Sequence, residues 1–391
     1  MKVTDIEKKE LTNYIELFDY DSYLKDKRIL ITGSKGLVGT GLVKWILFQN
    51  QLKGTNTKIL ASTRNPNDLP DYIEKSDNIK YVKHGTENSI DEKIDYIVHA
   101  ASPTGNKYHM QHPIETFKIN VDGVEKMLDI AARNDGCSMI YLSSEEIYGL
   151  PTDDSPAMTE DMVGAIDSLN LRSCYPLGKK ASEFLCHASA AEYGIDVKII
   201  RPTVIHGLFQ RYEEPRVVNE LLRCLVENKD FIMKSDGLTK KCMMYSLDAI
   251  SAIFTVLFKG KKGEAYNASN PETFITVRDL AQHLVETFNQ SIKVVFEIGT
   301  ATKSDGFLPH RTIVQDCSKL ISLGWMGVED KQISIEDLHI NLIRRTHTFN
   351  SVNDIIVVDG LIEHKTLMAP YFVIKRKLHN LKFKMRNDKK I

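Results

Sequence analysis

A short strand-like run that ends in a glycine-rich turn is the feature that most limits how this chain can fold. Arg28–Thr32 is apolar and β-branched, Gly33, Gly36 and Gly39 follow it, and an apolar stretch of helical character runs from Leu42 to Phe48. Strand, glycine turn and helix in this order form the first unit of a doubly wound α/β fold, in which the N-terminus of the helix meets a phosphate. We therefore predict a dinucleotide-binding fold.

The glycine turn has the spacing of a phosphate cradle. Gly33 allows the tight turn, Gly36 lets the backbone approach a pyrophosphate, and Gly39 permits close packing of the helix on the strand. Lys35 and Leu37 lie in the same turn, and we expect them to contact the cofactor with the glycines. The alternative interpretation is a glycine turn that binds nothing.

The end of the second predicted strand bears on the choice of cofactor. NAD-binding folds often carry an Asp or Glu about 20 residues beyond the glycines, and this sequence has neither there. The strand instead ends in Ser62 and Arg64. An Arg beside small hydroxyl side chains can bind a ribose 2′-phosphate through charge-assisted hydrogen bonds. We therefore expect tightly bound NAD or NADP, with NADP favoured, against the alternative that Arg64 is an ordinary surface residue.

Short apolar runs alternate with segments long enough for helices through the first half of the chain. This alternation indicates βαβ units, and so an α/β fold of the Rossmann type with a doubly wound parallel sheet and a smaller mixed α/β substrate-binding portion. The expected strands are Arg28–Thr32, Lys58–Ala61, Tyr96–His99, Met139–Leu142 and Val197–Ile200, and later helices are expected at Val217–Asn228, Leu247–Phe258, Val277–Asn289 and Ile335–Arg345. We divide the chain into a helical leader (1–25), a nucleotide-binding domain (26–203) to which later strands and helices return, a mostly substrate-binding portion (204–345) and a C-terminal extension (346–391).

Charge is distributed unevenly along the chain. The 391 residues carry a formal net charge of -1, but residues 371–391 hold eight basic side chains and one acid, so this tail is +7 and the remainder is -8. An acidic body disfavours nucleic-acid binding, while a basic, partly apolar tail could make weak contact with a membrane or a protein, or be a solvated end.

The sequence has no apolar run of about 18 residues and no secretory signal, which predicts a cytoplasmic protein. Scattered cysteines and histidines without ligand spacing predict reduced thiols and no metal site.

Hydroxyl, carboxylate and amine side chains gather in two further segments. Ser144, Glu145 and Glu146 follow the fourth predicted strand, at the edge of the sheet where open α/β folds bind ligands. Tyr175 and Lys179 lie on one face of a predicted helix, so the lysine ammonium could lower the pKa of the phenol and make it a usable base near neutrality. Alone this could be an ordinary surface pair, but beside the glycine turn it predicts a catalytic site.

Together these residues resemble the extended short-chain dehydrogenase/reductase family, the NAD-dependent epimerase/dehydratases, whose members act on nucleotide-linked sugars. Within it the chain is most similar to the UDP-glucuronate decarboxylase and nucleotide-sugar 4,6-dehydratase branch, from about Lys25 to about Arg345. The motifs that carry the resemblance are the three glycines, the set Ser144, Tyr175 and Lys179, and the segments His99–Pro103, Asn120–Gly123, Arg172–Tyr175, Arg216–Asn219, Asn270–Glu272 and Leu323–Trp325.

The resemblance implies a role for each motif. Tyr175 would remove the C4 hydroxyl proton of a nucleotide-diphosphate sugar, Lys179 would hold the cofactor ribose, and Ser144 would hydrogen-bond the C4 oxygen, giving a 4-keto sugar. It also implies a homodimer formed through two helices of each subunit. The further cofactor contacts that it implies are Ala100, Ala101, Ser102 and Asn120, and the substrate contacts are Pro103, Thr104, Arg216, Asn219, Lys241 and Arg311.

Departures from the branch bear on the reaction. Decarboxylases have Thr-Ser-Glu, and dehydratases of the dTDP-glucose type have Thr-Asp-Glu, where this chain has Ser-Glu-Glu. Glu146 could take the C5 proton while a protonated Glu145 helps the C6 hydroxyl to leave, and an extra carboxylate would repel a glucuronate. The alternative is that Glu145 points to solvent or pairs with a lysine. Val204 stands where the family usually has an Asn, and Lys241 stands where it has an Arg, which keeps the charge but loses the bidentate fork.

We therefore predict C4 oxidation of a nucleotide-activated hexose without net redox change, followed by chemistry at C5 and C6, either 4,6-dehydration or decarboxylation. One alternative is a nucleotide-sugar 4-epimerase. A second is an NADPH-dependent ketone or aldehyde reductase, because the Ser62 to Arg64 segment also resembles the corresponding segment of such reductases. A third, of a different class, is a non-catalytic nucleotide-sensing scaffold.

Overall fold

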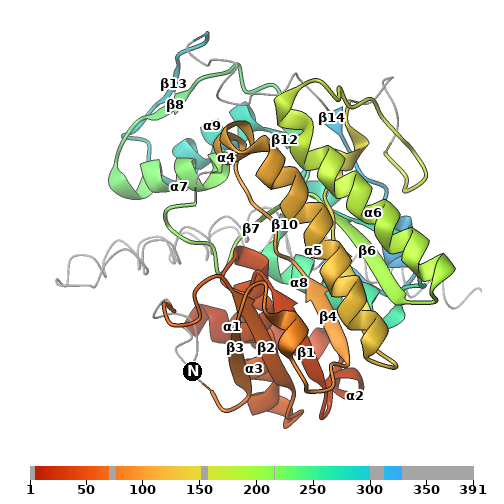
Figure 1. Ribbon diagram of the computed structural model, residues 1–391. Helices are drawn as coiled ribbons and strands as arrows, with labels where there is room; N and C mark the ends of the chain where they lie inside the picture. Colours follow the sequence, from red (N-terminus) through yellow and green to blue (C-terminus); the bar gives the residue numbers. More distant parts are fainter. Residues whose placement is uncertain (1–4, 70–75, 151–156, 215, 300–311, 328–391) are drawn as a thin grey trace, which may run out of the picture. The chain divides into compact units, whose positions relative to one another are not determined.

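The structure, a computed structural model, describes residues 5–69, 76–150, 157–214, 216–299 and 312–327 (Figure 1). The chain divides into two compact units, residues 1–341 and 342–391. The second unit lies outside the described residues, and so do the helix predicted at Ile335–Arg345, the basic tail and Arg311. The account below concerns the first unit.

A parallel sheet of seven strands forms the centre of this unit. Its order is β11-β6-β5-β4-β1-β2-β3, so the chain runs outward from β1 in one direction and then returns to build the sheet in the other. The strand order therefore reverses between β1 and β4, the place where open α/β sheets form their ligand crevice. The strands are β1 (Arg28–Thr32), β2 (Lys58–Thr63), β3 (Ile79–Lys83), β4 (Tyr96–His99), β5 (Ser138–Leu142), β6 (Asp196–Pro202) and β11 (Ala265–Ala268).

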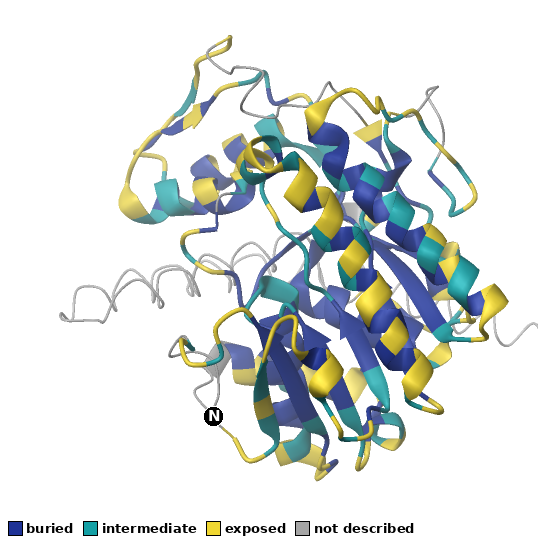
Figure 2. Cartoon of the chain, in the orientation of Figure 1, coloured by how far each residue is buried: buried dark blue, intermediate teal, exposed yellow. Residues whose placement is uncertain are grey.

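Helices cover both faces of the sheet, as expected for a doubly wound fold (Figure 1). Successive side chains of a strand point to opposite faces, so Ile29 and Ile31 of β1 join one apolar core while Leu30 joins the other. Figure 2 shows the strands largely buried and the helices α5 and α6 striped between buried and exposed residues. The first core contains α1 (Asp5–Leu17), α2 (Asp21–Leu24), α3 (Leu37–Lys53) and α8 (Ser246–Lys259), and the second contains α5 (Pro113–Arg133) and α6 (Cys174–Glu192).

The predicted N-terminal helix is present as α1, and it packs on α3 and α8. Its contacts are polar as well as apolar. Glu7 forms an ion pair of 3.0 Å with Lys44 of α3, and both side chains are buried. The hydroxyl of Tyr14 donates to Asp248 of α8 at 3.0 Å. Residues outside the catalytic resemblance thus complete one face of the nucleotide-binding fold.

Shorter elements make up the remainder of the described chain. Parallel pairs join β7 to β10 and β8 to β13, and β9 lies between β12 and β14. The strands are β7 (Val204–His206), β8 (Phe231–Met233), β9 (Lys240–Lys241), β10 (Met243–Tyr245), β12 (Ile275–Thr276), β13 (Val294–Phe296) and β14 (Thr312–Ile313). The helices are α4 (Asn106–Gln111), α7 (Val217–Glu227), α9 (Val277–Phe288) and α10 (Ser318–Ile321), with 3-10 turns η1 (Glu87–Ser89), η2 (Glu145–Tyr148), η3 (Leu171–Ser173) and η4 (Pro271–Thr273).

The predicted fold class is confirmed, and all five predicted strands lie in the large sheet. Two of its strands, β3 and β11, were not predicted. β3 has the sequence Ile-Lys-Tyr-Val-Lys and lies at an edge, where its side chains are only partly buried, and β11 is a run of four residues that contains a polar Asn267. Neither has the continuous apolar character that marks a strand buried on both faces.

Candidate active site

The glycine turn joins β1 to α3 at the carboxyl edge of the sheet, with Gly36 just before the helix. Gly33 has φ +67°, and a Cβ there would lie 2.9 Å from the carbonyl oxygen of Ala100. A Cβ on Gly39 would lie 2.2 Å from the carbonyl oxygen of Gly33. Each position therefore requires glycine, one for its backbone conformation and close approach to the neighbouring loop, the other for the contact of helix with turn.

The loop after β4 is fixed against this turn by side-chain hydrogen bonds. Thr32 accepts from the amide of Ala101 at 3.1 Å and lies 2.8 Å from Nδ1 of His99. Ser102 donates to Oδ1 of Asn120 at 2.9 Å. The predicted cofactor residues of both loops are thus brought together at the crevice between β1 and β4. Backbone amides at the start of α3 beside a glycine cradle fit the pyrophosphate of a dinucleotide.

The end of β2 differs from the prediction. Ser62 is fully buried and its hydroxyl donates to Glu87, which also bonds to His84. Burial raises the pKa of Glu87, but the hydrogen bonds from His84 and Ser62 lower it further, to about 2. The Ser62 hydroxyl is therefore engaged by a carboxylate and is not presented to a ribose phosphate, while Arg64 is exposed. A cavity of about 660 Å³ lies between η1 and α5, and His84 and Glu87 are among its lining residues.

Ser144, Tyr175 and Lys179 come together across η2 and the first turns of α6. Tyr175 is partly buried, and the Ser144 hydroxyl is close enough to lower its pKa. Lys179 is buried, donates to the carbonyl oxygen of Leu142 at 2.6 Å, and lies 5.7 Å from the centre of the Tyr175 ring. The predicted catalytic set is thus one cluster at the carboxyl end of β5.

The electrostatics of this cluster correct one expectation. We expected the Lys179 ammonium to lower the pKa of Tyr175. Instead burial and the charge of Glu146 raise the pKa of Tyr175 to about 12, against the lowering effect of the Ser144 hydrogen bond. Burial lowers the pKa of Lys179 itself to about 7. In the protein alone, burial is the largest influence on the pKa of each of these two side chains.

The two carboxylates after Ser144 turn to different basic partners. Glu146 forms an ion pair of 2.9 Å with Arg172, which also donates to Asn106 at 3.0 Å. Glu145 is buried, accepts from the hydroxyl of Thr203 at 2.7 Å and lies 3.5 Å from the ammonium of Lys241. The structure therefore matches the alternative in which Glu145 pairs with a lysine.

The predicted substrate residues are divided between the cleft and the scaffold. Arg216 bonds to Glu214 at 3.1 Å and to the carbonyl of Ile205, and keeps part of its side chain exposed. The Asn219 amide is buried and donates to three carbonyl oxygens between Arg211 and Glu214, so it holds that turn instead of facing a ligand. Pro103 and Thr104 lie between β4 and α4.

Sequence reasoning missed two parts of the site. His109 of α4 stacks on the Tyr175 ring, with ring centres 4.8 Å apart and planes 13° from parallel. Burial and the charge of Arg172 lower the pKa of His109, which keeps the imidazole neutral. A lone histidine in a polar segment gave no signal of this contact.

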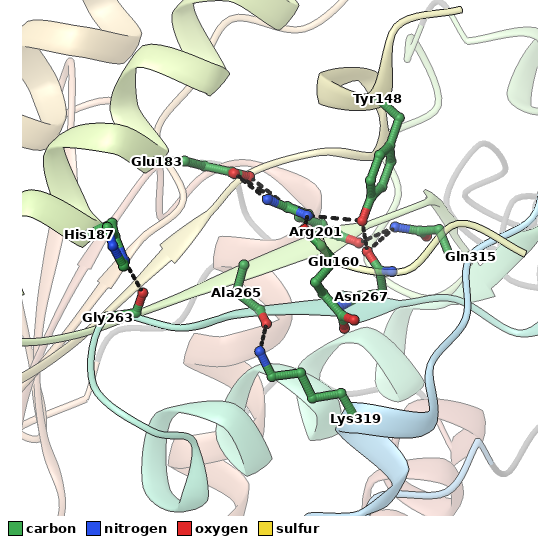
Figure 3. Close-up of polar contacts among 10 residues, drawn as sticks. All are labelled: Tyr148, Glu160, Glu183, His187, Arg201, Gly263, Ala265, Asn267, Gln315 and Lys319. Carbon is green, nitrogen blue, oxygen red and sulfur yellow. Dashed lines mark hydrogen bonds and ion pairs between the residues drawn. The ribbon is translucent and has the colours of Figure 1, made fainter. Parts of the chain in front are cut away.

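The second missed feature is a buried network around Arg201 of β6 (Figure 3). Arg201 forms an ion pair of 2.7 Å with Glu183 of α6, donates to the hydroxyl of Tyr148 at 2.9 Å and donates to the carbonyl of Glu160 at 2.7 Å. Asn267 of β11 accepts from Tyr148 at 2.6 Å. Glu183 lies one helical turn beyond Lys179, so the network connects the helix that carries Lys179 to the turn that carries Ser144.

Comparison with known proteins shows the family of this chain. The sequence model of the NAD dependent epimerase/dehydratase family matches residues 29–269, and the chain belongs to this family. UDP-glucuronic acid decarboxylase 6 of Arabidopsis thaliana is 27% identical over 279 residues, which cover 71% of this chain and 77% of the relative.

Solved structures share the fold at lower identity. The dTDP-glucose 4,6-dehydratase of Bacillus anthracis, in complex with NAD, superposes with a TM-score of 0.67 at 20% identity, over 82% of this chain and 97% of that one. The UDP-glucose 4-epimerase of Thermotoga maritima, with UDP-glucose, gives 0.68 at 18% identity, over 82% of this chain and all of that one. The chain is thus an enzyme-family member with the Rossmann-type fold of nucleotide-sugar dehydratases and epimerases.

Proposed function

We propose that this protein oxidises C4 of a nucleotide-activated hexose to a 4-keto intermediate, with no net redox change, and then carries out chemistry at C5 and C6. The observation that carries the proposal is the single cluster of Ser144, Tyr175 and Lys179 at the carboxyl end of β5, beside the glycine turn of β1. A hydroxyl, a phenol and an amine in this arrangement can exchange a proton with a sugar hydroxyl.

Each residue of the cluster has a defined task in this reaction. As the phenolate that a cationic Lys179 favours, Tyr175 takes the proton of the C4 hydroxyl, and Ser144 donates a hydrogen bond to the C4 oxygen. Lys179 lies close to the phenol and becomes cationic most readily when anionic groups enter the cleft, because its pKa of about 7 is set by burial. A bound NAD or NADP, held by Gly33, Gly36 and the loop after β4, supplies redox chemistry at C4.

Glu146 is the residue that we assign to C5. A ketone at C4 acidifies the C5 hydrogen, so a carboxylate beside Tyr175 can remove it. The ion pair with Arg172 holds Glu146 in place, and the Arg172 guanidinium lies 5.8 Å from the centre of the Tyr175 ring, which supports a position of Glu146 near the phenol. Loss of water from C6 gives 4,6-dehydration and loss of a C6 carboxylate gives decarboxylation, whereas return of hydrogen to the other face of C4 gives epimerisation.

The reaction is tested by incubating the purified protein with a panel of UDP-, GDP-, CDP- and dTDP-sugars and measuring the masses of the products by mass spectrometry. Loss of one water identifies dehydration, loss of carbon dioxide identifies decarboxylation, and an unchanged mass with a new stereoisomer identifies epimerisation. Net consumption of NADPH in proportion to product would instead support the alternative of a reductase. A panel in which no sugar is changed would contradict the proposal.

The cofactor preference is proposed separately. Arg64 is exposed at the carboxyl end of β2, where it can bind a 2′-phosphate, and this supports NADP over NAD. Titration of the protein with both nucleotides tests this. We expect Arg64→Ala to weaken NADP binding and leave NAD binding unchanged, and equal effects on both would contradict the preference.

Other features of the proposal concern assembly and location. The packed helices α5 and α6 expose Ile114 (76%) and Phe184 (69%), which supports a homodimer formed through these helices.

In the part of the chain that the structure describes, no helix has the length and apolarity to cross a membrane. A cytoplasmic location and weak contact of residues 371–391 with a membrane or a protein remain proposals, the latter testable by liposome co-sedimentation of full-length and truncated protein.

A further inference from the structure

One face of the Tyr175 ring is covered by a side chain from another helix. His109 of α4 is buried and lies nearly parallel to the phenol, with ring centres 4.8 Å apart and planes 13° from parallel. Aromatic rings at this separation attract each other beyond the effect of their burial. The contact therefore restricts movement of the phenol perpendicular to its own plane.

The imidazole that makes this contact is itself held in one orientation. Its Nε2 lies 3.3 Å from the carbonyl oxygen of Pro103, in the loop that follows β4. A carbonyl oxygen only accepts hydrogen bonds, so Nε2 carries the hydrogen. Among the described residues Nδ1 has no hydrogen-bond partner, and a second hydrogen there would be buried without an acceptor. His109 is thus a neutral ring, and it adds no charge beside the phenol.

Contacts with α4 also hold the start of α6, where Tyr175 is the second residue. A side-chain cap usually orders the first turn of a helix, but Ser173, just before α6, makes no such hydrogen bond. The thiol of Cys174, the first residue of α6, instead donates to the carbonyl of His109 at 3.6 Å. The first turn of α6 is therefore supported by α4 instead of by its own cap.

We propose that His109 is a positioning residue, whose ring fixes Tyr175 at the place where it can exchange a proton with the C4 hydroxyl. The inference rests on the proposed function and adds a residue to its machinery. The cationic groups of Arg172 and Lys179 lie 5.8 Å and 5.7 Å from the centre of the phenol ring, so His109 is the nearer contact. A displacement of a reacting group by about 1 Å costs about 100-fold in rate. We therefore expect His109 to affect kcat and not KM.

The test compares two substitutions at His109 in full-length, cofactor-loaded protein, with whichever of UDP-glucose, dTDP-glucose and UDP-glucuronate the wild type turns over. His109→Leu removes the flat ring, and His109→Phe keeps a ring that can stack on Tyr175. We expect kcat to fall at least about tenfold in His109→Leu, with KM within about twofold, and to stay within about threefold of wild type in His109→Phe. Tyr108→Leu is the matched control and should keep wild-type kcat, because the Tyr108 ring contacts His112 instead.

A second measurement does not depend on turnover. In protein with isotope-labelled tyrosine, the NMR signal of Tyr175 is identified by its loss in Tyr175→Phe. A stacked ring shifts the signals of the atoms on its face, so His109→Leu should move the Tyr175 signal and Tyr108→Leu should not.

Three results would overturn the inference alone while the wild type remains active. These are an unchanged kcat in His109→Leu, an unmoved Tyr175 signal in that variant, and a His109→Phe protein as slow as His109→Leu at equal thermal stability. Failure of the wild type to change any sugar of the panel would overturn the proposed function, and the inference with it.

Discussion

Lys179 lies almost entirely out of water, and this has a measurable effect on how stability depends on pH. Burial lowers the pKa of its ammonium from 10.5 to about 7. Unfolding returns the side chain to water, so the unfolded chain binds more protons than the folded one between these two values. Burial of Lys179 therefore lowers the free energy of unfolding very little above pH 10.5, where the side chain is neutral in both states. It lowers the free energy of unfolding more and more as the pH falls towards 7. From about pH 9 to about pH 7 the linked loss amounts to about 2 kcal/mol.

The assay is guanidinium-induced unfolding of wild type and Lys179→Met at both pH values. Methionine has a similar length and no charge, so the stability of the Lys179→Met protein lacks this dependence on pH. We expect the difference in free energy of unfolding between the two proteins to shift by about 2 kcal/mol in favour of wild type at the higher pH. Lys180→Met, at the neighbouring partly buried position, is the matched control and should follow wild type. A Lys179→Met difference that is the same at both pH values would refute the reasoning.

Three further results are expected from the same structure. Gly39→Ala should abolish NAD(P) binding measured by fluorescence titration, because its Cβ would lie 2.2 Å from the Gly33 carbonyl oxygen; binding at wild-type affinity would contradict this. Arg201→Met should lower the free energy of unfolding by about 3–5 kcal/mol, since it leaves Glu183 buried and uncompensated, and adding Glu183→Gln should restore part of the loss in denaturant titrations. Phe184→Glu should convert a dimer to a monomer in light scattering, and a wild-type protein that is already monomeric would contradict the homodimer.

Much of the fold could be predicted because its signals are local. Arg28–Thr32 and Tyr96–His99 are buried on both faces and read as continuous apolar runs, and Gly39 is required by a contact with Gly33, six residues before it. The edge strand β3 has no such run because one side of it faces solvent. Its absence from the prediction also hid Glu87, which follows that strand and engages Ser62.

The candidate site could be predicted as a set of residues but not as a set of interactions. The spacing of Tyr175 and Lys179 indicates one helical face, yet the direction of their pKa shifts depends on burial, which the tertiary fold decides. The partners of Glu145 are Thr203 and Lys241, far apart in sequence and brought together by β6 and β9. No local pattern marks such pairs, because ion pairs between distant elements leave no periodic signal.

The central claim is that a hydrogen leaves C4 of a nucleotide hexose and is returned to the sugar without net redox change. The most direct measurement uses the sugar deuterated at C4, with cofactor in amounts far below substrate, and follows the position of deuterium by NMR and the amount of product by mass spectrometry. We predict many turnovers for each cofactor, deuterium retained in the product, and loss of turnover in Tyr175→Phe. One cofactor consumed for each product, or full turnover in Tyr175→Phe, would contradict the account.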